Sequence, residues 1–507
     1  MDINRKLLSN SVYLFLDLFA VNLLGLVFWF MVGRFLLPGQ TGIVSTSINL
    51  ALLLSSICFL GFQGALSKLI PEYLEKGQHS KIVSLIRFSL KIIILSNLAI
   101  ISILFLFFPV VSNFIKLPTD ALILSIAILF SVTISSFFGS IIYGFQDMKR
   151  FFKTDFVGVL AKVLLTLILL FFGFSYLGPL IGILIGYIIV DLMRFRKSWF
   201  FSSTDRINGK KIFFNYSFPA FIASMTGLVF SNFQVVLLAT LERQQTTGIF
   251  ALAFLITSVV LVIPGILSQA LFPITSLLSV GRRIKKQSYL IQLVFRYATL
   301  LILPVGIFMI FFSKPIILLL RPEYLEATVL FPTLTLAAIF FGLGQVFLSN
   351  IYALGKTKLH RNIWIFLSVL FLLLAPALIK LYSAQGLALS YLISSVASLA
   401  TGYYFIKKIL NLRIDWKNLL KIVVSSAIFL LFLLLSDLAQ FNLVIKIMIV
   451  LFGSIVYLLV LIPLKFYKSE DVRILTIFAE KSPLFRRQFL FLANFLSKWL
   501  EKGNKSE

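Results

Sequence analysis

The sequence predicts an all-α polytopic membrane protein, and three observations lead to this fold class. Hydrophobic residues make up 60% of the 507 residues and charged residues 13%. The mean hydropathy is +1.02, and these values lie far outside those of soluble proteins. The hydrophobic residues form runs of about 20, the length of a helix that spans a bilayer. Positive charges gather in every second connection between the runs, as they do in cytoplasmic loops.

We count fourteen apolar runs and expect each to form one transmembrane helix. The runs lie at residues 11–33, 42–66, 88–108, 121–143, 155–173, 177–193, 213–240, 249–277, 290–312, 328–354, 362–379, 386–406, 422–439 and 443–464. With a cytoplasmic N-terminus, the outside connections hold seven of the 46 Lys and Arg residues, and the cytoplasmic side holds the other 39. If the count missed one helix, every later connection would be assigned to the opposite side and the asymmetry would be lost. The charges therefore support the count and place both termini in the cytoplasm.

The net charge of +27 follows the expected membrane topology. We therefore expect it to contact anionic lipid headgroups and expect no nucleic-acid partner. Cys58 is the single cysteine and lies within the second run, so no disulfide framework is expected. The first run is too long for a signal peptide and lacks a small-residue cleavage site. We expect a multi-pass protein of the cell membrane that keeps this run as an anchor.

An internal repeat divides the chain. Gln40-Thr41-Gly42-Ile43 resembles Thr246-Thr247-Gly248-Ile249 at an offset of 206 residues. Further anchors keep nearly this offset: Pro109 and Ala121 match Pro315 and Ala327, Ile142-Tyr143 matches Ile351-Tyr352, and Gly178 matches Gly386. A shared offset indicates two copies of one unit, related by an axis along the membrane normal. The expected parts are an N-lobe of six spans at 1–200, a C-lobe of six spans at 201–410, two further spans at 411–465 and a cytoplasmic amphipathic tail at 466–507.

Polar or small residues recur in three runs, mostly at a spacing of seven residues and otherwise of three or four, which places them along one side of a helix. The second run carries Asn49, Ser56 and Gln63; the seventh carries Ser217, Ser224, Ser231 and Gln234; and the eighth carries Ser258, Gly265, Gln269 and Ser276. Hydrocarbon offers hydroxyls and amides no partner, so these stripes must face protein or water. We expect them to line a polar cavity between the lobes.

Three charged side chains are further candidates for a binding site. Asp17 is the acid deepest in the first run, and it either couples transport to an ion or is a buried partner of a neighbouring polar group. Arg34 and Arg243 end the first helix of each lobe on the outside. They either hold phosphate with forked hydrogen bonds or extend toward lipid headgroups.

The sequence carries no motif for catalysis or for a cofactor. Gly355-Lys356-Thr357 ends like a phosphate-binding loop, but Asn350 stands where that loop needs a glycine. His79 and His360 lie in no cluster with metal-ligand spacing, so no metal is expected. We therefore expect a protein that is not an enzyme.

The two six-span lobes with two extra spans, the segment 32–42 (Val-Gly-Arg-Phe-Leu-Leu-Pro-Gly-Gln-Thr-Gly) and the loop 142–147 (Ile-Tyr-Gly-Phe-Gln-Asp) resemble the polysaccharide and oligosaccharidyl-lipid flippases. These belong to the multidrug/oligosaccharidyl-lipid/polysaccharide exporter superfamily, and the likeness extends to about residue 465. The resemblance implies a V-shaped pair of lobes around a cavity lined chiefly by the first, second, seventh and eighth helices.

The resemblance also implies a function. A flippase of this kind carries a polyprenyl-(pyro)phosphate-linked oligosaccharide or polysaccharide repeat unit from the inner to the outer leaflet by alternating access. The membrane potential alone would drive it, or H+ or Na+ would be a coupling ion, and glycan-assembly enzymes are candidate partners.

Three alternative functions stay open from the sequence. A cation-coupled multidrug exporter of the same superfamily needs carboxylates in its cavity, and only Asp17 qualifies. A peptidoglycan-precursor (lipid II) flippase is a narrower form of the same activity. A membrane glycosyltransferase or glycan polymerase is the alternative from a different class.

Overall fold

The computed structural model describes residues 3–200, 205, 207–280, 283–438, 443–473, 476, 486–488, 490 and 493–497. Among them every regular element is a helix. The chain separates into two compact units, which we describe one at a time. Unit 1 comprises Met1–Val259, Ser313–Gly344 and Lys356–Gly402, and unit 2 comprises Val260–Phe312, Gln345–Gly355 and Tyr403–Glu507. The amphipathic helix predicted in the tail at 466–507 falls largely outside the described residues.

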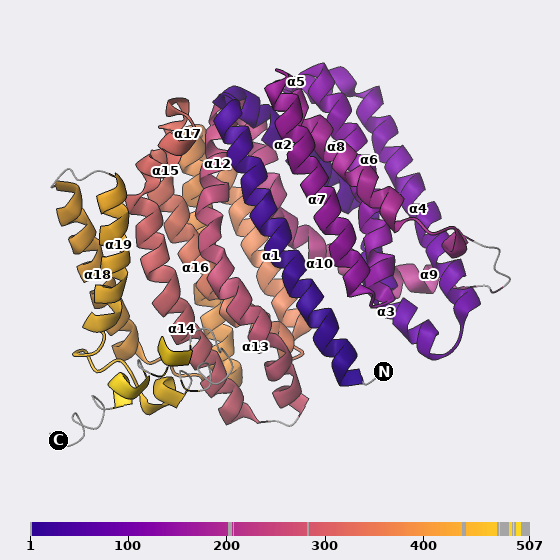
Figure 1. The fold of residues 1–507 in the computed structure, drawn as a ribbon. Coiled ribbons are helices and arrows are strands. Elements are labelled where there is room, and N and C mark those ends of the chain that lie inside the picture. Colours follow the sequence, from indigo (N-terminus) through magenta and orange to yellow (C-terminus); the bar gives the residue numbers. More distant parts are fainter. Residues whose placement is uncertain are drawn as a thin grey trace. The chain divides into compact units, whose positions relative to one another are not determined.

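The helices of unit 1 follow the predicted runs (Figure 1). The first part holds α1 (Ile3–Phe35), α2 (Pro38–Phe59), α3 (Phe62–Glu75), α4 (His79–Leu106), α5 (Phe108–Ile115), α6 (Thr119–Gly144), α7 (Met148–Phe171) and α8 (Leu177–Arg194). Next come η1 (Lys197–Phe200), α9 (Gly209–Ile212), the π-helix η2 (Phe213–Ser217), α10 (Phe218–Leu228), the π-helix η3 (Val229–Phe233), α11 (Gln234–Leu241) and α12 (Gln244–Ser258). The last part holds α15 (Ser313–Leu320), η5 (Pro322–Tyr324), α16 (Ala327–Ala353) and α17 (Thr357–Leu410), of which α16 and α17 end in unit 2.

Unit 2 is built around the helices that follow α12 and α17. They are η4 (Val259–Leu261), which begins at the boundary between the units, α13 (Val262–Val280), α14 (Ile284–Phe311), α18 (Trp416–Leu438) and α19 (Leu443–Val460). The hydroxyl of Tyr457 on α19 donates a hydrogen bond to the carbonyl of Leu300 on α14 at 2.8 Å. Phe429 on α18 is 1% exposed and packs in the same apolar core. The last two spans are therefore fastened to α14.

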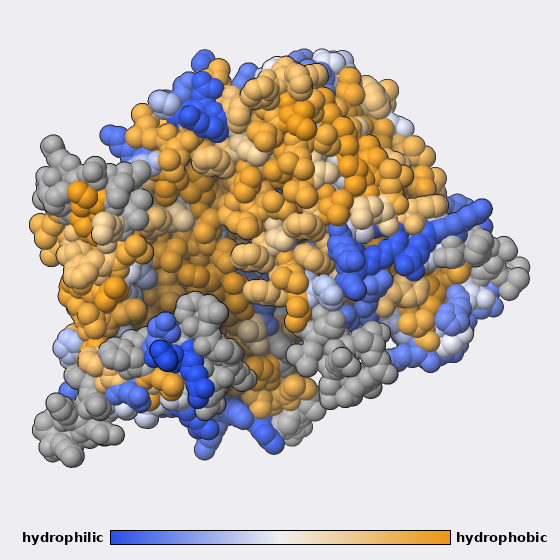
Figure 2. All heavy atoms as spheres, viewed as in Figure 1, coloured by the Kyte–Doolittle hydropathy of each residue, from blue (hydrophilic) through white to orange (hydrophobic). Residues whose placement is uncertain are grey.

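Twelve helices in the described part of the chain are long and apolar enough to cross a membrane. One of them, α17, has 54 residues and is broken at Ser383 (φ 53°, ψ −134°), so it contains the two predicted runs at 362–379 and 386–406. Figure 2 shows apolar residues over the long helices, with many of the hydrophilic residues near helix ends. The predicted all-α polytopic membrane fold is confirmed.

Three predicted helices are interrupted. The eighth run, predicted at 249–277, is divided into α12 and α13 by the 3-10 turn η4. The second run, predicted as one helix at 42–66, ends as α2 at Phe59, and Leu60 (φ 50°) and Gly61 (φ 73°) turn the chain into α3. A positive φ costs little at glycine, so Gly61 makes this turn accessible. The seventh run contains the π-helical turns η2 and η3. Each π-turn adds a residue to the helix and changes the side on which later residues lie.

Residues of the internal repeat occupy matching places in their helices. Gly42 is the fifth residue of α2, and Gly248 is the fifth residue of α12. Pro109 and Pro315 both lie in the first turn of an eight-residue helix, α5 and α15 respectively. The short sequence echo therefore corresponds to similar local structure.

Candidate functional site

Helices α2 and α12 cross at their N-terminal turns with their backbones almost in contact. A Cβ atom on Gly42 would lie 1.8 Å from the carbonyl oxygen of Gln244, and a Cβ atom on Gly248 would lie 2.0 Å from the carbonyl oxygen of Pro38. Any larger residue would push the helices apart, as at other small-residue crossings in membranes. This crossing lies at the end of unit 1 that the charge distribution assigns to the outside.

Gln244 fastens the crossing with its side chain. The amide oxygen accepts a hydrogen bond from Thr46 at 3.0 Å, and the amide nitrogen donates to the carbonyl of Ile115 at 2.9 Å. Lys116 donates to the carbonyl of Glu242 at 2.8 Å. The start of α12 is thereby joined to both α2 and the end of α5.

Two arginines at the same end of unit 1 each donate a hydrogen bond to the last carbonyl of a neighbouring helix. Nη1 of Arg34 on α1 donates to the carbonyl of Leu320, the last residue of α15, at 2.7 Å. Nη1 of Arg321 donates to the carbonyl of Phe35, the last residue of α1, at 3.3 Å. A cation is favourable at a helix C-terminus, where unpaired carbonyls carry partial negative charge. We call this pair of contacts the arginine lock.

Tyr324 extends the arginine lock toward α2. Its hydroxyl donates to the carbonyl of Leu36 at 3.0 Å and lies 2.6 Å from the hydroxyl of Thr41. Burial raises the pKa of Tyr324 to about 12, so the hydroxyl keeps its proton at neutral pH. The turn between α1 and α2 is therefore covered by the turn after α15.

Two hollows adjoin the arginine lock. An open pocket of about 690 Å³ is lined by Arg34, Phe35, Arg321 and Glu323, so guanidinium groups face it from two elements. A second hollow of about 320 Å³ is lined by apolar residues of α1, α12 and α15, among them Phe30 and Leu320. A polar, cationic opening thus lies close to an apolar groove.

Asn49 and Asn232 join α2 to the π-helix η3. The amide nitrogen of Asn232 donates to the side-chain oxygen of Asn49 at 3.0 Å, and Ser231 donates to the side-chain oxygen of Asn232 at 2.9 Å. An interhelical amide pair of this kind satisfies groups that hydrocarbon could not. Asn232 was not among the predicted site residues, because it falls outside the seven-residue spacing.

The predicted stripe of the seventh run does not stay on one face. Ser224 and Ser231 are exposed, whereas Ser217 and Gln234 are both fully buried. For Gln234 the reason is the π-helical turn η3, which lies between Ser224 and Gln234 and rotates the later residues around the axis. Ser217 precedes η3 and is buried against the turn into α3, where a Cβ atom on Gly61 would lie 2.2 Å from the carbonyl oxygen of Ser217. Ser224 and Ser231 remain candidates for a passage, and Gln234 packs inside unit 1.

The other predicted site residues also lie on different helices and differ in their exposure. Asn49 and Ser56 are half-buried on α2, but Gln63 lies on α3 beyond the Gly61 turn and is exposed. Ser258 is half-buried at the end of α12, whereas Gln269 is exposed on α13 in unit 2. Arg243 precedes α12, is exposed and does not line the pocket beside Arg34.

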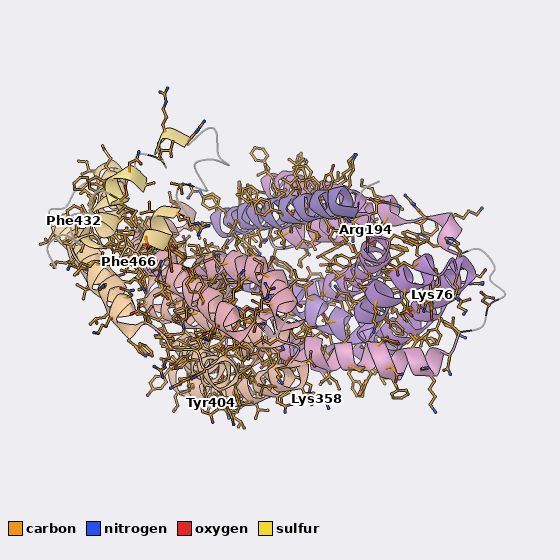
Figure 3. All side chains as sticks on the ribbon, turned by 90° about the horizontal axis from the view of Figure 1, so that it is seen from below. Lys76, Arg194, Lys358, Tyr404, Phe432 and Phe466 are labelled. Atoms are coloured by element: carbon orange, nitrogen blue, oxygen red, sulfur yellow. The ribbon has the colours of Figure 1, made fainter. Side chains whose placement is uncertain are left out.

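A buried ion pair joins α7 and α8. Arg194, labelled in Figure 3, is 3% exposed, and its guanidinium donates to Asp155 at 2.5 Å, to Thr154 at 3.0 Å and to the carbonyl of Ser135 at 3.0 Å. The sequence places Arg194 among the cytoplasmic charges and does not predict the pair. Asp191, one helical turn before Arg194, was a signal that a cation there could be compensated within the protein.

Asp17 belongs to the same buried group. It is 9% exposed on α1, lies within electrostatic reach of Asp155 and Arg194, and its Oδ1 makes no hydrogen bond with a described residue. One guanidinium therefore faces more than one carboxylate. Within the described residues no group of three His, Cys, Asp or Glu side chains is arranged to hold a metal ion.

The sequence model of the family described as "Polysaccharide biosynthesis protein" matches residues 7–279, more than half of the chain. The chain belongs to this family. No curated protein matches its sequence. The family assignment and the many apolar helices establish a multi-pass membrane protein of the polysaccharide biosynthesis family.

Solved structures share the fold of this family member. The lipid II flippase MurJ in an inward closed conformation has a TM-score of 0.70 and 19% identity, over 89% of this chain and 98% of that one. An inward-facing MATE multidrug resistance transporter of the MOP superfamily has a TM-score of 0.64 and 14% identity, over 79% and 94%. The MATE multidrug transporter DinF-BH has a TM-score of 0.59 and 18% identity, over 81% and 97%. The fold is therefore that of known flippases and exporters.

Proposed function

We propose that the protein carries a polyprenyl-(pyro)phosphate-linked oligosaccharide or polysaccharide repeat unit from the inner to the outer leaflet of the cell membrane, for the synthesis of a cell-surface glycan. The family assignment supports glycan biosynthesis, and the shared fold supports transport. The observation that carries the proposal is the exposure of Ser224 and Ser231 on a helix that spans the membrane. Both hydroxyls donate within their own helix, Ser224 to the carbonyl of Phe221 at 2.9 Å and Ser231 to the side chain of Asn232 at 2.9 Å. Their acceptor positions stay open, and water or a sugar hydroxyl suits these better than hydrocarbon does, so we expect them to face an aqueous passage.

The passage would run between the proposed lobes at 1–200 and 201–410, which rock about it in alternating access. Hydroxyls and amides would bind sugar. The candidates remain Asp17, Arg34, Asn49, Ser56, Gln63, Ser217, Ser224, Ser231, Gln234, Arg243, Ser258 and Gln269, and exposure favours Ser224, Ser231, Gln63 and Gln269 over the buried members.

The outer gate of this cycle would be the arginine lock together with the α2–α12 crossing. When the gate opens, Arg34 and Arg321 lose their carbonyl acceptors, and phosphate oxygens are suited to replace them because guanidinium binds phosphate with two parallel hydrogen bonds. The apolar groove beside Phe30 and Leu320 has the chemistry to hold part of a polyprenyl chain. The headgroup would thus cross through water while its tail stays in lipid.

Energy for the cycle need not come from ATP. With the cell interior negative, outward movement of each anionic charge gains roughly 2.3 kcal/mol per 100 mV. A lipid-linked pyrophosphate carries such charges, so the membrane potential drives it outward.

Asp17 supports a second candidate, ion-coupled transport. A buried carboxylate with an unsatisfied oxygen beside Asp155 and Arg194 is suited to exchange a proton or Na+. This arrangement favours a coupled cycle, either for the glycan lipid or in a cation-coupled multidrug exporter. A lipid II flippase would use the same passage with a different headgroup.

Cysteine labelling tests for the aqueous passage. In a Cys58→Ala background, single cysteines at Ser224 and Ser231 are exposed to a membrane-impermeant maleimide in vesicles of each orientation. Cysteines at the buried Ser217 and Gln234 are the matched controls from the same run. Label at the first pair and not at the second supports the passage. No label at either exposed position, with or without substrate, excludes it.

A translocation assay tests the substrate. Full-length protein in proteoliposomes is given a fluorescent polyprenyl-diphosphate oligosaccharide, and an impermeant lectin reports sugar on the opposite side. A cationic dye and labelled lipid II are run in parallel. Movement of the oligosaccharide lipid alone supports the proposal, and movement of the dye alone overturns it in favour of a multidrug exporter.

A further inference from the structure

Unit 2 contains a small pocket that no candidate site residue lines. It has a volume of about 70 Å³ and lies among α14, α16, α18 and the segment after α19. One water needs roughly 10–15 Å³ of such volume, so the pocket has room for a phosphate or an alkylammonium group. Its lining includes Phe347, Leu419, Arg296, Asp415, Lys468 and Glu470.

Arg296 is the buried cation of this pocket, with 7% of its surface exposed. Nη2 donates to Asp471 and to the hydroxyl of Tyr297. The guanidinium also lies 5.2 Å from the ring centre of Phe466, a residue labelled in Figure 3. Nε is buried and makes no hydrogen bond with a described residue. Such a donor is costly to leave unpaired, so the guanidinium retains capacity to bind an acceptor that enters the pocket.

The other charged side chains of the lining are exposed. Lys468 forms an ion pair with Asp415 at 3.1 Å. Desolvation raises the pKa of Asp415, but hydrogen bonds from Lys468 and Asn418 outweigh it and leave the pKa below its ordinary value, so this carboxyl is ionised at neutral pH. Glu470 adds a second carboxylate, which interacts with the hydroxyl of Tyr289 in the same lining. The pocket therefore offers both signs of charge.

We expect the pocket to lie at the depth of lipid headgroups. Helix α18 begins at Trp416, directly after Asp415, and this tryptophan is 63% exposed. Tryptophan is enriched where the bilayer meets water. The apolar side chains Phe347 and Leu419 line the same hollow. A ligand with a charged head and an apolar tail matches this position.

We propose that the pocket binds the headgroup of a zwitterionic aminophospholipid, phosphatidylethanolamine. Its phosphate accepts hydrogen bonds from Arg296, and its ammonium group donates to the carboxylates of Asp415 and Glu470. Together with Asp471, which Arg296 binds, the charged side chains at the pocket are two cations and three carboxylates, and this excess of carboxylates favours a ligand that also carries a positive charge over a bare anion. The lipid would connect α18 to α14 at the membrane surface.

Native mass spectrometry of the full-length protein in detergent tests this proposal. The protein is titrated with phosphatidylethanolamine, phosphatidylcholine, phosphatidylglycerol and soluble phosphoethanolamine. Phosphatidylcholine is the matched lipid, because it keeps both charges but its trimethylated ammonium has no N–H to donate. We expect phosphatidylethanolamine to bind about tenfold more tightly than phosphatidylcholine, the effect of one charge-assisted hydrogen bond.

Variants separate the pocket from surrounding lipid. Arg296→Lys keeps the charge opposite Asp471 but loses the planar fork, and Glu470→Gln removes an exposed carboxylate without disturbing packing. Each is expected to lower the affinity for phosphatidylethanolamine about tenfold. Lys417→Gln, an exposed charge change that does not line the pocket, is expected to leave the affinity unchanged. Melting temperatures without lipid verify that the variants are folded.

Several outcomes would overturn the proposal. If all three lipids bound with equal affinity and none of the variants changed it, the bound lipid would be surrounding lipid only and not a ligand of the pocket. Tighter binding of phosphatidylglycerol that depends on Arg296 but not on Glu470 would mean an anion site. If soluble phosphoethanolamine bound as tightly as phosphatidylethanolamine, the ligand of the pocket would not need to come from the bilayer.

Discussion

Gly248 of α12 and Gly42 of α2 meet backbone to backbone: a Cβ atom on Gly248 would lie 2.7 Å from the amide nitrogen of Gly42. The two glycines are equivalent in the internal repeat and occupy the fifth position of their helices. The absence of a side chain at both positions therefore permits the crossing that we propose as part of the outer gate.

Alanine at either glycine is expected to disrupt this crossing. Gly42→Ala and Gly248→Ala should each lower the free energy of unfolding by about 1–3 kcal/mol, because the new methyl group meets backbone that cannot rotate away. Gly39→Ala is the matched control, since a Cβ atom there has no neighbour within 4 Å. Thermal unfolding in detergent measures the difference. A Gly248→Ala protein as stable as the Gly39→Ala protein would contradict the observed packing.

Loss of the arginine lock is expected to favour an outward-open state. Arg34→Gln removes the hydrogen bond to the Leu320 carbonyl, and because Arg34 is exposed we expect a shift of about 1 kcal/mol, or about fivefold in population. Labelling of a single cysteine at Thr41 from outside would measure it. Arg243→Gln, at another exposed arginine expected on the same side, should not increase labelling. Equal labelling of both variants would exclude a gating role for Arg34.

Removal of one partner of the buried ion pair should be much more damaging than removal of both. Arg194→Gln leaves Asp155 uncompensated and is expected to cost about 3–5 kcal/mol of stability. The double variant Arg194→Gln/Asp155→Asn should recover part of that loss, because the carboxylate that Arg194 binds directly is then neutral, whereas Asp17 is left without the cation in both variants. Melting temperatures of Arg194→Gln, Asp155→Asn and the double variant, each compared with the unchanged protein, measure the coupling between Arg194 and Asp155 in a double-mutant cycle. Additive losses would show that the pair is not coupled in the folded protein.

Asp17→Asn separates ion coupling from drive by the membrane potential. If Asp17 carries the coupling ion, the variant should lose its response to an imposed pH or Na+ gradient while it keeps its response to an imposed potential. The observable is the rate of lectin-reported translocation in proteoliposomes under each gradient. A variant with the gradient response of the unchanged protein would eliminate Asp17 as the coupling group.

The hydrophobic runs predicted most of the fold because the length of a helix that crosses a bilayer is fixed by bilayer thickness. The breaks were harder to predict. Leu60–Gly61 and the π-turn η3 lie inside predicted runs, and the polar residues Ser231 and Asn232 within η3 are equally compatible with a polar stripe on a continuous helix. The repeated glycine, Gly42 in one copy and Gly248 in the other, was informative because close contact between two helix backbones requires a glycine at both positions.

The candidate site was predicted less completely, and the reason lies in helix phase. Ser224 and Ser231 precede or fall within η3 and stay exposed as the spacing indicated, whereas Gln234 follows η3 and is buried. The partners of Arg34 and Arg194 could not be derived either. Their contacts join residues 286 and 39 positions apart, and long-range pairs of this kind depend on tertiary packing.

The arginine lock uses main-chain oxygens as acceptors, with Leu320 and Phe35 contributing their carbonyls rather than their side chains. Every amino acid supplies such an oxygen, so this contact by itself sets no requirement on the residue types opposite Arg34 and Arg321. Comparison of homologous sequences would consequently detect no correlated substitutions across this contact. Grafting the two arginines and the helix ends into a related protein would be enough to transfer it.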